Sequence, residues 1–431
     1  MRLWRYDLFA EHPSEYFSME GGHKMRMMRY LFTGLIFIYG GLLTVREAEA
    51  MPITPDKAIH QLVEGNNSFA LALYSQLKHI DGNLFFSPYS LSSALSMTYG
   101  GARGETAHEM ADALGFDLPC DLLHPAFAEL NERLMSKKQL TLSLANSLWL
   151  QKGTELLEEY LDLTSEYYDA AVMLTDFMID PDESCRRINK WVVEQTQEKI
   201  HNIITPGNIN ALTRLILTNA IYFKGNWEKE FNKNQTREEN FYVQQDRHVK
   251  AAFMRQQGNF KYGESEDAQV LQVPYDGGSL GMLLVLPKTQ DGLAALESGL
   301  TMERMKRWQQ ALAMREVKIA IPRFRAKTAV ELSESLKALG MNQAFTNTAN
   351  FSGIDGTEEL SLSSVLHEAF IDVTEEGAEA AAATAVIIGV TAVRDPAPVP
   401  EFRAEHPFLY AILDLDSGSI LFLGRCIDPG R

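Results

Sequence analysis

The chain has few cysteines and lacks the short motifs that bind metals or phosphates. Its three cysteines, Cys120, Cys185 and Cys426, are an odd number and lie far apart, which argues against a disulfide framework. The ten histidines include no HExxH motif and no other paired spacing, and no Gly-rich phosphate loop occurs. We therefore expect no bound metal and no cofactor.

Positive charge is also scarce. The 431 residues contain 40 Lys and Arg against 57 Asp and Glu, so the formal net charge is −17, and no basic helix stands out. Nucleic acids and anionic membranes attract positively charged surfaces. We therefore expect neither of them as a partner.

The N-terminal segment has the three parts of a secretory signal peptide. A basic start at Met25–Arg29 precedes an apolar run at Leu31–Val45, and Ala48-Glu49-Ala50 follows as a cleavage site. The run is shorter than the roughly 20 residues that a membrane-spanning helix needs. We expect a natural start at Met25 or later, a signal peptide at about 25–50, and a secreted, extracellular or periplasmic protein. An uncleaved anchor is the alternative.

Residues 1–50 are therefore predicted to be an N-terminal extension, and residues 51–431 a single domain. No Pro/Gly/Ser-rich linker divides the chain between 56 and 431. Helical and strand-like patterns alternate without βαβ regularity, which indicates an α+β fold. The predicted helices lie at 57–78, 155–169, 185–200 and 329–339, and the clearest predicted strands at 140–150, 214–223 and 361–374. Ser87-Pro88 is predicted to begin a further helix, and Thr106 with Glu109 to form a capping box.

A small-residue tract near the C-terminus is the most informative segment. An acidic turn ends at Glu379, four alanines follow at Ala380–Ala383, and a β-branched run begins at Thr384. Ala favours helices and β-branched residues favour strands, so the segment has no single preference. Ala378, Ala380, Ala382 and Thr384 alternate, and together they would give a new strand one small, uncharged face. We interpret the segment as an exposed loop that a sheet can recruit; a linker or the end of an Ala-rich helix is the alternative.

The frame of this tract, "SSVLHEAFIDVTEEGAEAAAATAVI", resembles the reactive-loop hinge of the serpins. Three further blocks resemble the same family and occur in serpin order: "NLFFSPYSLSSALSMTYGGARGETAHEM", "LILTNAIYFKGNWEKEF" and "AEHPFLYAILDLDSGSILFLGR". Together they cover the chain from about residue 56 to 431. The resemblance implies a fold in which helices surround three mostly antiparallel or mixed β-sheets, with an exposed reactive-centre loop at about 375–401.

The resemblance also assigns residues to the loop. The implied hinge residues are Glu375, Glu376, Gly377, Ala378, Glu379, Ala380, Ala381, Ala382, Ala383 and Thr384. In the family the cleaved bond lies about fourteen residues after the hinge Gly, which points to Thr391–Ala392. Val390–Thr391 and Val393–Arg394 are the alternatives. A small or β-branched residue at this bond implies an elastase-like or subtilisin-like target, whereas Arg394 would suit a trypsin-like protease.

Polar residues in otherwise apolar segments form a second candidate site. Polar groups in buried strands need hydrogen-bond partners. By resemblance, Ser87, Ser90, Asn219 and His367 meet beneath the central sheet in the region called the shutter. Trp227 resembles the family Trp at the top of that sheet, where loop entry begins. A core histidine with no role in sheet opening is the alternative for His367.

The implied activity is suicide inhibition of a serine protease through a covalent acyl complex, not catalysis. The implied protein is a monomer prone to loop-sheet polymerisation, which would appear as ladders in native gels after mild heating. A non-inhibitory carrier or chaperone is one alternative. A hydrolase is another, because Gly277-Gly278-Ser279-Leu280-Gly281 matches G-x-S-x-G, with His367 or His406 as a base. That motif needs a strand, a sharp turn and a helix, whereas strand-like residues flank it here, which predicts a hairpin turn.

Overall fold

The computed structural model describes residues 53–137, 140–378 and 398–430. Every element described below lies in the compact unit Pro55–Arg431. Its helices are α1 Pro55–Leu77, α2 Pro88–Gly101, α3 Gly104–Leu114, α4 Cys120–Met135, α5 Glu158–Tyr168, α6 Pro181–Gln195, α7 Leu293–Ser298, α8 Met302–Ala311, α9 Ser333–Ala338 and α10 Ser352–Asp355, with 3₁₀ turns η1 Lys233–Gln235 and η2 Gln343–Phe345.

The strands alternate irregularly with these helices along the chain. They are β1 Leu84–Phe86, β2 Leu140–Gln151, β3 Ala171–Thr175, β4 Leu215–Asn226, β5 Arg237–Gln244, β6 Arg247–Glu264, β7 Ala268–Pro274, β8 Leu280–Pro287, β9 Ala313–Pro322, β10 Phe324–Glu331, β11 Leu362–Thr374, β12 Gly377–Ala378, β13 Glu401–Arg403, β14 Phe408–Asp414 and β15 Ile420–Cys426. The predicted α+β class is confirmed.

The described strands form two hydrogen-bonded sheets, although the resemblance implies three. One sheet has nine strands in the order β1-β15-β14-β8-β7-β6-β9-β13, with β5 paired to β6, and the other has six in the order β10-β11-β12-β4-β2-β3. The reason is the length of β6, whose 18 residues pair with β5 and β9 over one stretch and with β7 at Lys261–Glu264. One continuous strand thus joins two groups of strands.

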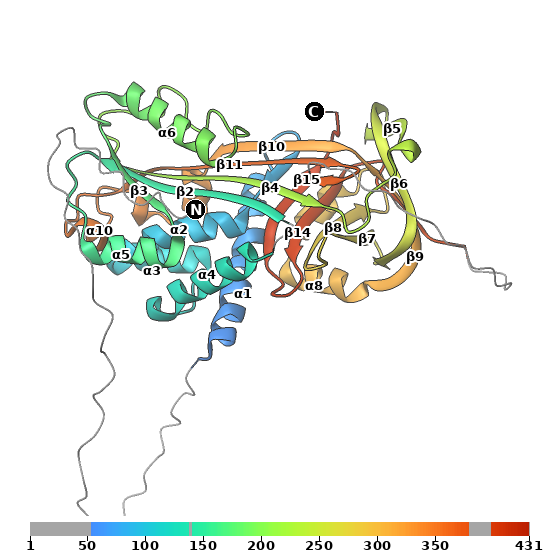
Figure 1. The fold of residues 1–431 in the computed structure, drawn as a ribbon, viewed down its shortest axis with the longest axis horizontal. Helices are drawn as coiled ribbons and strands as arrows, with labels where there is room; N and C mark the ends of the chain where they lie inside the picture. Colours follow the sequence, from blue (N-terminus) through green and yellow to red (C-terminus); the bar gives the residue numbers. More distant parts are fainter. Residues whose placement is uncertain (1–52, 138–139, 379–397, 431) are drawn as a thin grey trace, which may run out of the picture. The chain divides into compact units, whose positions relative to one another are not determined.

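The six-stranded sheet lies between helices. In Figure 1, α6 lies on one side of β2, β4 and β11, and α2 lies on the other. Ile188 and Val192 of α6 pack with Trp149 of β2 and Ile216 of β4 in one buried cluster. Burial of both faces explains why the predicted strand at 214–223, "RLILTNAIYF", is almost wholly apolar.

Two local predictions have different outcomes. Ser87 caps α2 as predicted: its Oγ accepts from the backbone N–H of Ser90, and Pro88 is the first helical residue. The predicted capping box of Thr106 and Glu109 is wrong, because α3 already begins at Gly104. The Glu109 carboxylate instead accepts from the backbone N–H groups of Asn342 and Gln343, at 2.7 and 2.6 Å, and therefore caps η2.

Candidate functional site

A buried hydrogen-bond network connects the two central strands of the six-stranded sheet. β11 and β4 run parallel and pair directly, with His367 in register with Asn219. His367 Nδ1 lies 2.6 Å from Asn219 Oδ1, and the Asn219 amide donates to the hydroxyl and carbonyl oxygens of Ser90. Ser87 donates its backbone N–H to His367 Nε2 over 3.3 Å. The structure therefore brings the four predicted polar residues together, and all four are buried.

The partners fix the protonation of His367. Since the Ser87 backbone N–H can only donate, Nε2 is an acceptor, and the ring proton lies on Nδ1, which donates to Asn219. Burial lowers the pKa of His367 to about 3, although the hydrogen bond that the ring donates to Asn219 opposes this shift. The imidazole is therefore neutral at pH 7, and its two nitrogens use one donor and one acceptor.

The sequence did not indicate every member of this network. Asn146 of β2 lies in register with Asn219, and its Oδ1 accepts from the Asn219 amide. Ser87 Oγ also donates to the carbonyl oxygen of Leu421 in β15, over 2.7 Å. Asn146 had the same signal as Asn219, a polar residue inside an apolar strand, but it lies outside the motif that drew attention to Asn219.

The predicted hinge includes a short strand, β12, that lies between the same two strands. Gly377 and Ala378, which form β12, pair antiparallel with Thr374 and Val373 of β11 on one side. On the other side they pair antiparallel with Asn226 and Gly225 of β4. Further down, β11 and β4 pair with each other from Leu362–Leu215 to Phe370–Tyr222. The first two residues after the acidic turn thus already occupy the place of a central strand.

Gly377 is suited to this place by its missing side chain. Its φ is +132°, a conformation that residues with a side chain rarely adopt. A Cβ there would lie 2.2 Å from the carbonyl oxygen of Gly225 and 2.5 Å from the Cα of Asn226. The chain can therefore enter between the strands at this point only as glycine.

Glu375 and Glu376 are buried, whereas we expected residues 375 onward to form an exposed loop. Glu375 is 1% exposed and accepts from the Arg323 guanidinium and the Thr236 hydroxyl. Burial alone would raise the pKa of Glu375, but Arg323 and Thr236 outweigh it and hold the pKa below its usual value. Glu376 is 4% exposed and forms an ion pair with Lys233. Each of the two carboxylates is thus paired with a cation inside the fold, so the described residues of the predicted hinge are anchored.

Trp227, which the resemblance assigns to the top of the sheet, lies beside the acidic turn and β12. Its indole N–H donates to the carbonyl oxygen of Thr374 over 2.9 Å, and its backbone N–H donates to Glu376. The ring stacks on Tyr275 with centroids 4.6 Å apart. Trp227 thus connects the end of β4 to both the end of β11 and the acidic turn.

The rest of the predicted loop lies outside the described residues. This applies to the hinge residues Glu379, Ala380, Ala381, Ala382, Ala383 and Thr384, to the Thr391–Ala392 bond, and to the rival Arg394.

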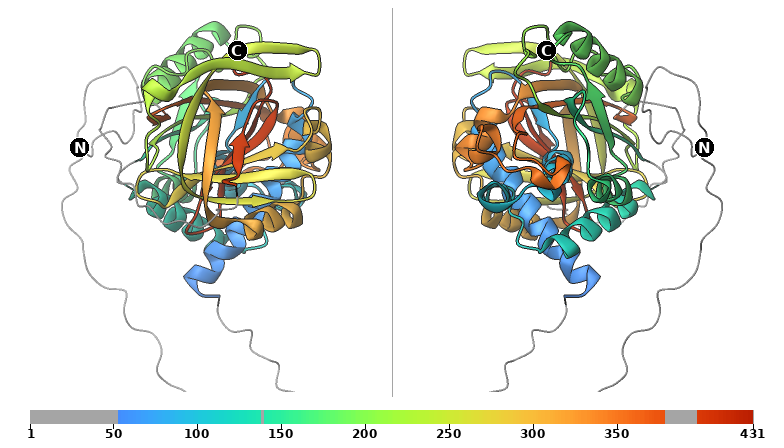
Figure 2. Two further views of the ribbon diagram at one scale, coloured as in Figure 1. Left: turned by 90° about the vertical axis from the view of Figure 1, so that its right-hand side faces the viewer. Right: turned by 90° about the vertical axis from the view of Figure 1, so that its left-hand side faces the viewer.

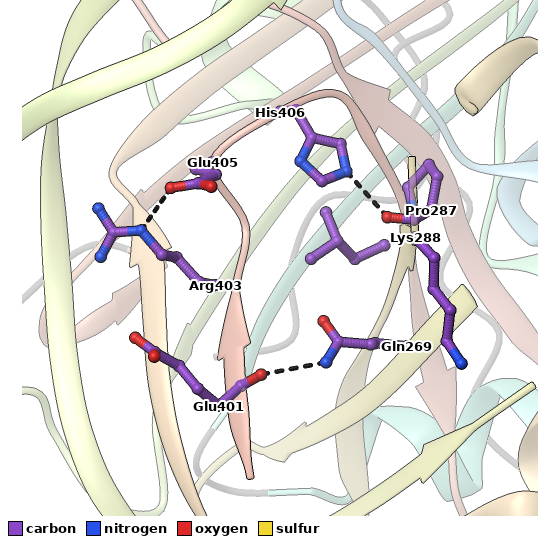
Figure 3. Close-up of a pocket in the computed structure, with 8 residues that line it drawn as sticks. Gln269, Pro287, Lys288, Glu401, Arg403, Glu405 and His406 are labelled. Carbon is purple, nitrogen blue, oxygen red and sulfur yellow. Dashed lines mark hydrogen bonds and ion pairs between the residues drawn. The ribbon is translucent and has the colours of Figure 1, made fainter. Parts of the chain in front are cut away.

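The described chain resumes next to a surface pocket. This pocket of about 430 Å³ lies between β13 and the ends of β7 and β8, and Figure 3 shows its side chains. His406 donates from Nε2 to the carbonyl oxygen of Pro287, and the Gln269 amide donates to the carbonyl oxygen of Glu401. The Arg403 guanidinium is engaged by Glu405 and Glu239. These contacts connect β13 and the residues after it to β5, β7 and β8 of the same nine-stranded sheet.

The predicted hairpin turn is confirmed, and the geometry required for a hydrolase is absent there. Ser279 lies in the connection between β7 and β8, which pair antiparallel. Gly277 and Gly278 of this turn have φ of +82° and +67°. No helix follows Ser279, and the two candidate bases, His367 and His406, are engaged elsewhere, at Asn219 and at Pro287.

Metal-binding clusters and membrane-spanning helices are both absent from the part of the chain that the structure describes. The described residues contain no group of three or more His, Cys, Asp or Glu side chains placed to hold a metal ion. None of the helices that the structure describes is long and apolar enough to cross a membrane.

Comparison with known proteins gives a consistent result. The model of a family described as "Serpin (serine protease inhibitor)" matches residues 64–429. Human Serpin B3 is 40% identical over 395 residues, which cover 86% of this chain and 100% of that protein. The leukocyte elastase inhibitor of Bos taurus is 38% identical, with 86% and 100% covered.

A solved structure with a ligand is also similar. Human thyroxine-binding globulin, complexed with thyroxine, has a TM-score of 0.78 and 28% identity, with 86% of this chain and 99% of that chain covered. The family model, the relatives and the arrangement of β11, β12 and β4 agree with the motifs read from the sequence. The chain belongs to the serpin family.

Proposed function

We propose that this chain inhibits serine proteases by inserting its cleaved reactive loop between β11 and β4. The observation that carries the proposal is β12: its two residues already pair with both strands, while β11 and β4 pair with each other below them. A new strand that continues β12 would separate this lower pair and take its place in the sheet.

The register of β12 specifies where each later residue would go. Ala378 pairs with Val373 and Gly225. Six residues further along an antiparallel strand, Thr384 would lie opposite His367 and Asn219. It would thus enter between the two side chains that hydrogen-bond to each other in the closed sheet. A hydroxyl can both donate and accept, so it can partner each of them when their direct bond breaks.

The same register suits the alternation of the tract. Directly opposed residues share a face of the sheet, so Thr384, Ala382 and Ala380 would share the core face with His367. Glu379 would lie on the opposite face, between Asp372 and Lys224. The inserted strand would therefore place small residues against the core and its charge near solvent, next to a lysine.

The chemical step is the ordinary first half of proteolysis. The protease serine oxygen attacks the carbonyl carbon of Thr391, the C–N bond to Ala392 breaks, and Ala392 leaves as a new, protonated amino terminus. The ester to Thr391 remains. At about 3.3 Å per residue, fourteen inserted residues would carry the tethered protease roughly 45 Å. A displacement of about 1 Å already costs on the order of a hundredfold in rate, so the ester persists.

The energy for this movement comes from completing the sheet. Each new backbone hydrogen bond contributes about 0.5–1.5 kcal/mol net, and the small side chains gain buried area.

We propose an elastase-like or subtilisin-like target, because Thr391 and Ala392 suit a pocket for small side chains. A trypsin-like target cut after Arg394 is the second candidate, and mass spectrometry of the released C-terminal peptide separates the two.

The test of inhibition uses the hinge. Ala380→Arg or Ala382→Pro should turn the protein into a substrate, because a bulky charge facing the core, or a missing N–H, slows insertion. Denaturing gels of wild type with an elastase-like protease should show a covalent complex, and those of the variants mainly cleaved protein. Ala397→Arg, the same change beyond the cleaved bond, is the matched control and should still trap. Trapping by both hinge variants at wild-type efficiency would contradict the proposal.

We also propose that the chain is exported after removal of a signal peptide at about residues 25–50. The basic, apolar and A-x-A parts of that segment support this. N-terminal sequencing of the mature protein should begin at Met51 or within a few residues of it. A mature protein that retains Leu31–Val45 would contradict export by cleavage.

A further inference from the structure

Within the six-stranded sheet, the ion pairs that the structure describes between neighbouring strands join β10 to β11, on one side of the line along which the loop would enter. Three cations on β10 or just before it pair with three carboxylates on β11 or just after it. The pairs are Arg323–Glu375 at 2.5 Å, Arg325–Asp372 at 2.8 Å and Lys327–Glu368 at 2.6 Å. Between β11 and β4 the described residues show no ion pair.

The last of these pairs is unusual because Glu368 is fully buried. Its side chain is 0% exposed, whereas that of Lys327 is 51% exposed. Among the described residues, neither carboxylate oxygen has a hydrogen-bond donor with good geometry, so the Lys327 ammonium is its partner. A buried carboxylate without a cation is strongly destabilising. Glu368 therefore keeps β11 next to β10.

On β4, the residue in register with Glu368 is small and uncharged. In the closed sheet, Ala220 of β4 is in register with Glu368. The register of β12 would place Ala383 between them, so insertion would add only a methyl group next to the carboxylate. A cation on β4 would instead be moved away by one strand spacing, about 4.7–4.9 Å. The position of Lys327 thus allows the pair to persist in both states.

The two faces of β11 carry different kinds of interaction. Glu368 and Asp372 alternate with His367 along β11, so they lie on the face away from the hydrogen-bond network. On the network's face, His367 bonds directly across to Asn219 and must release it when the strands part. Neutral hydrogen bonds therefore connect β11 to β4, the two strands that would separate. Ion pairs connect β11 to β10, the two strands that would stay together.

We infer that Arg325 and Lys327 are positioning residues for loop insertion: with Asp372 and Glu368 they keep β10 and β11 together, so that the sheet parts between β11 and β4. The need for such a device follows from the strand order, because β10 is the edge strand and pairs with β11 alone. An edge strand that separated during opening would leave β11 free to follow the loop rather than receive it. This inference rests on the proposed function.

The test compares Lys327→Met and Arg325→Gln with wild type. Both variants should require several-fold more inhibitor per trapped protease, because a loosely held β11 slows insertion, while the rate of initial protease binding stays unchanged. Lys327→Arg, which keeps the charge, should restore the wild-type stoichiometry. Arg186→Gln removes a pair of similar length on α6, Arg186–Glu183 at 2.8 Å, and should have no effect. A stoichiometry that Lys327→Met and Arg325→Gln leave unchanged would overturn the inference.

Hydrogen exchange separates this inference from the proposed function. We would measure the amides of β10 in each protein before and after the loop is nicked. In wild type they should stay protected in both states, and in Lys327→Met with Arg325→Gln they should exchange faster before nicking. If wild type traps no protease, the proposed function fails. Whatever the outcome of trapping, β10 amides that exchange as slowly in the double variant as in wild type would overturn the inference. Arg325 is 71% exposed, so Arg325→Gln keeps the test valid even if Lys327→Met fails to fold.

Discussion

At the scale of single residues, the close approach at Gly377 can be tested separately from its backbone angle. Gly377→Ala would place an alanine at an unfavourable φ of +132° and its Cβ within 3 Å of backbone atoms. Gly340→Ala meets a similar φ of +108° with nothing within 4 Å. Strain of this kind costs about 1–3 kcal/mol. We expect Gly340→Ala to lower the melting temperature modestly, and Gly377→Ala to lower it further and to reduce trapping.

Thermal melts and complex formation measured on both variants check this prediction. Equal melting temperatures would mean that the chain can move away from Gly225 at no cost, which would contradict the fixed entry point described above.

The buried imidazole of His367 predicts a loss of stability in acid. Burial lowers its folded pKa to about 3, whereas an unfolded His has a pKa of about 6.5. As the pH falls below about 6.5, the unfolded chain binds the proton first, so this contribution to stability is complete above 6.5 and is lost towards 3. At pH 5 the loss is about 2 kcal/mol.

Denaturant unfolding of wild type and His367→Gln at pH 7 and pH 5 checks this. His124, whose pKa burial lowers to about 4, titrates in the same direction in both proteins. The variant should therefore have a smaller, but not zero, dependence on pH. Equal dependence in the two proteins would exclude His367 as the titrating group.

Residue-scale features differed in how well the sequence predicted them. Asn219 and His367 could be predicted because polar residues in apolar strands must find partners. Arg323 and Lys233 could not, because they lie 52 and 143 residues from the carboxylates that they neutralise, and no local pattern connects such distant positions. The same limit applies to Lys327 and Glu368.

At the scale of elements, Glu109 shows how a helix residue can cap another segment. Its carboxylate accepts from two backbone N–H groups at the start of η2. Glu109→Gln keeps the size of the side chain and removes its charge, so it should weaken η2 and lower stability by about 1 kcal/mol. Chemical denaturation measures the change. Glu105→Gln, in the first turn of the same helix, is the control and should have a smaller effect.

The boundaries of elements were predicted well where periodicity was strong and less well where a segment was too short to show a period. β2 and β11 begin within a residue of their predicted starts, since alternation of apolar residues marks them. The predicted helix at 329–339 is instead the end of β10 followed by α9, because short apolar runs fit both periods. β12 could not be predicted, since two residues carry no periodicity.

At the scale of the whole molecule, the uncut protein should be the less stable form. Below β12, β11 pairs directly with β4, so the described sheet has no strand at the place where the proposed function would insert the loop. Nicking the loop with a protease that is then removed should therefore raise the melting temperature by tens of degrees, because the new strand adds hydrogen bonds along its length. Calorimetry on intact and nicked samples measures this. Equal melting temperatures would remove the energy source of the proposed mechanism and favour a carrier.

The two residues of β12 have a consequence for how such a protein can diversify. Because Gly377 and Ala378 already lie in register with both neighbours, the face that each residue up to Thr384 would take is decided before any protease arrives. Insertions or deletions beyond Thr384 would change which residues a protease meets at the cleaved bond. They would leave the register of the earlier residues unchanged. Under the proposed function, related chains could therefore change their target protease through substitutions at the far end of the loop, while the register of the inserted strand stays the same.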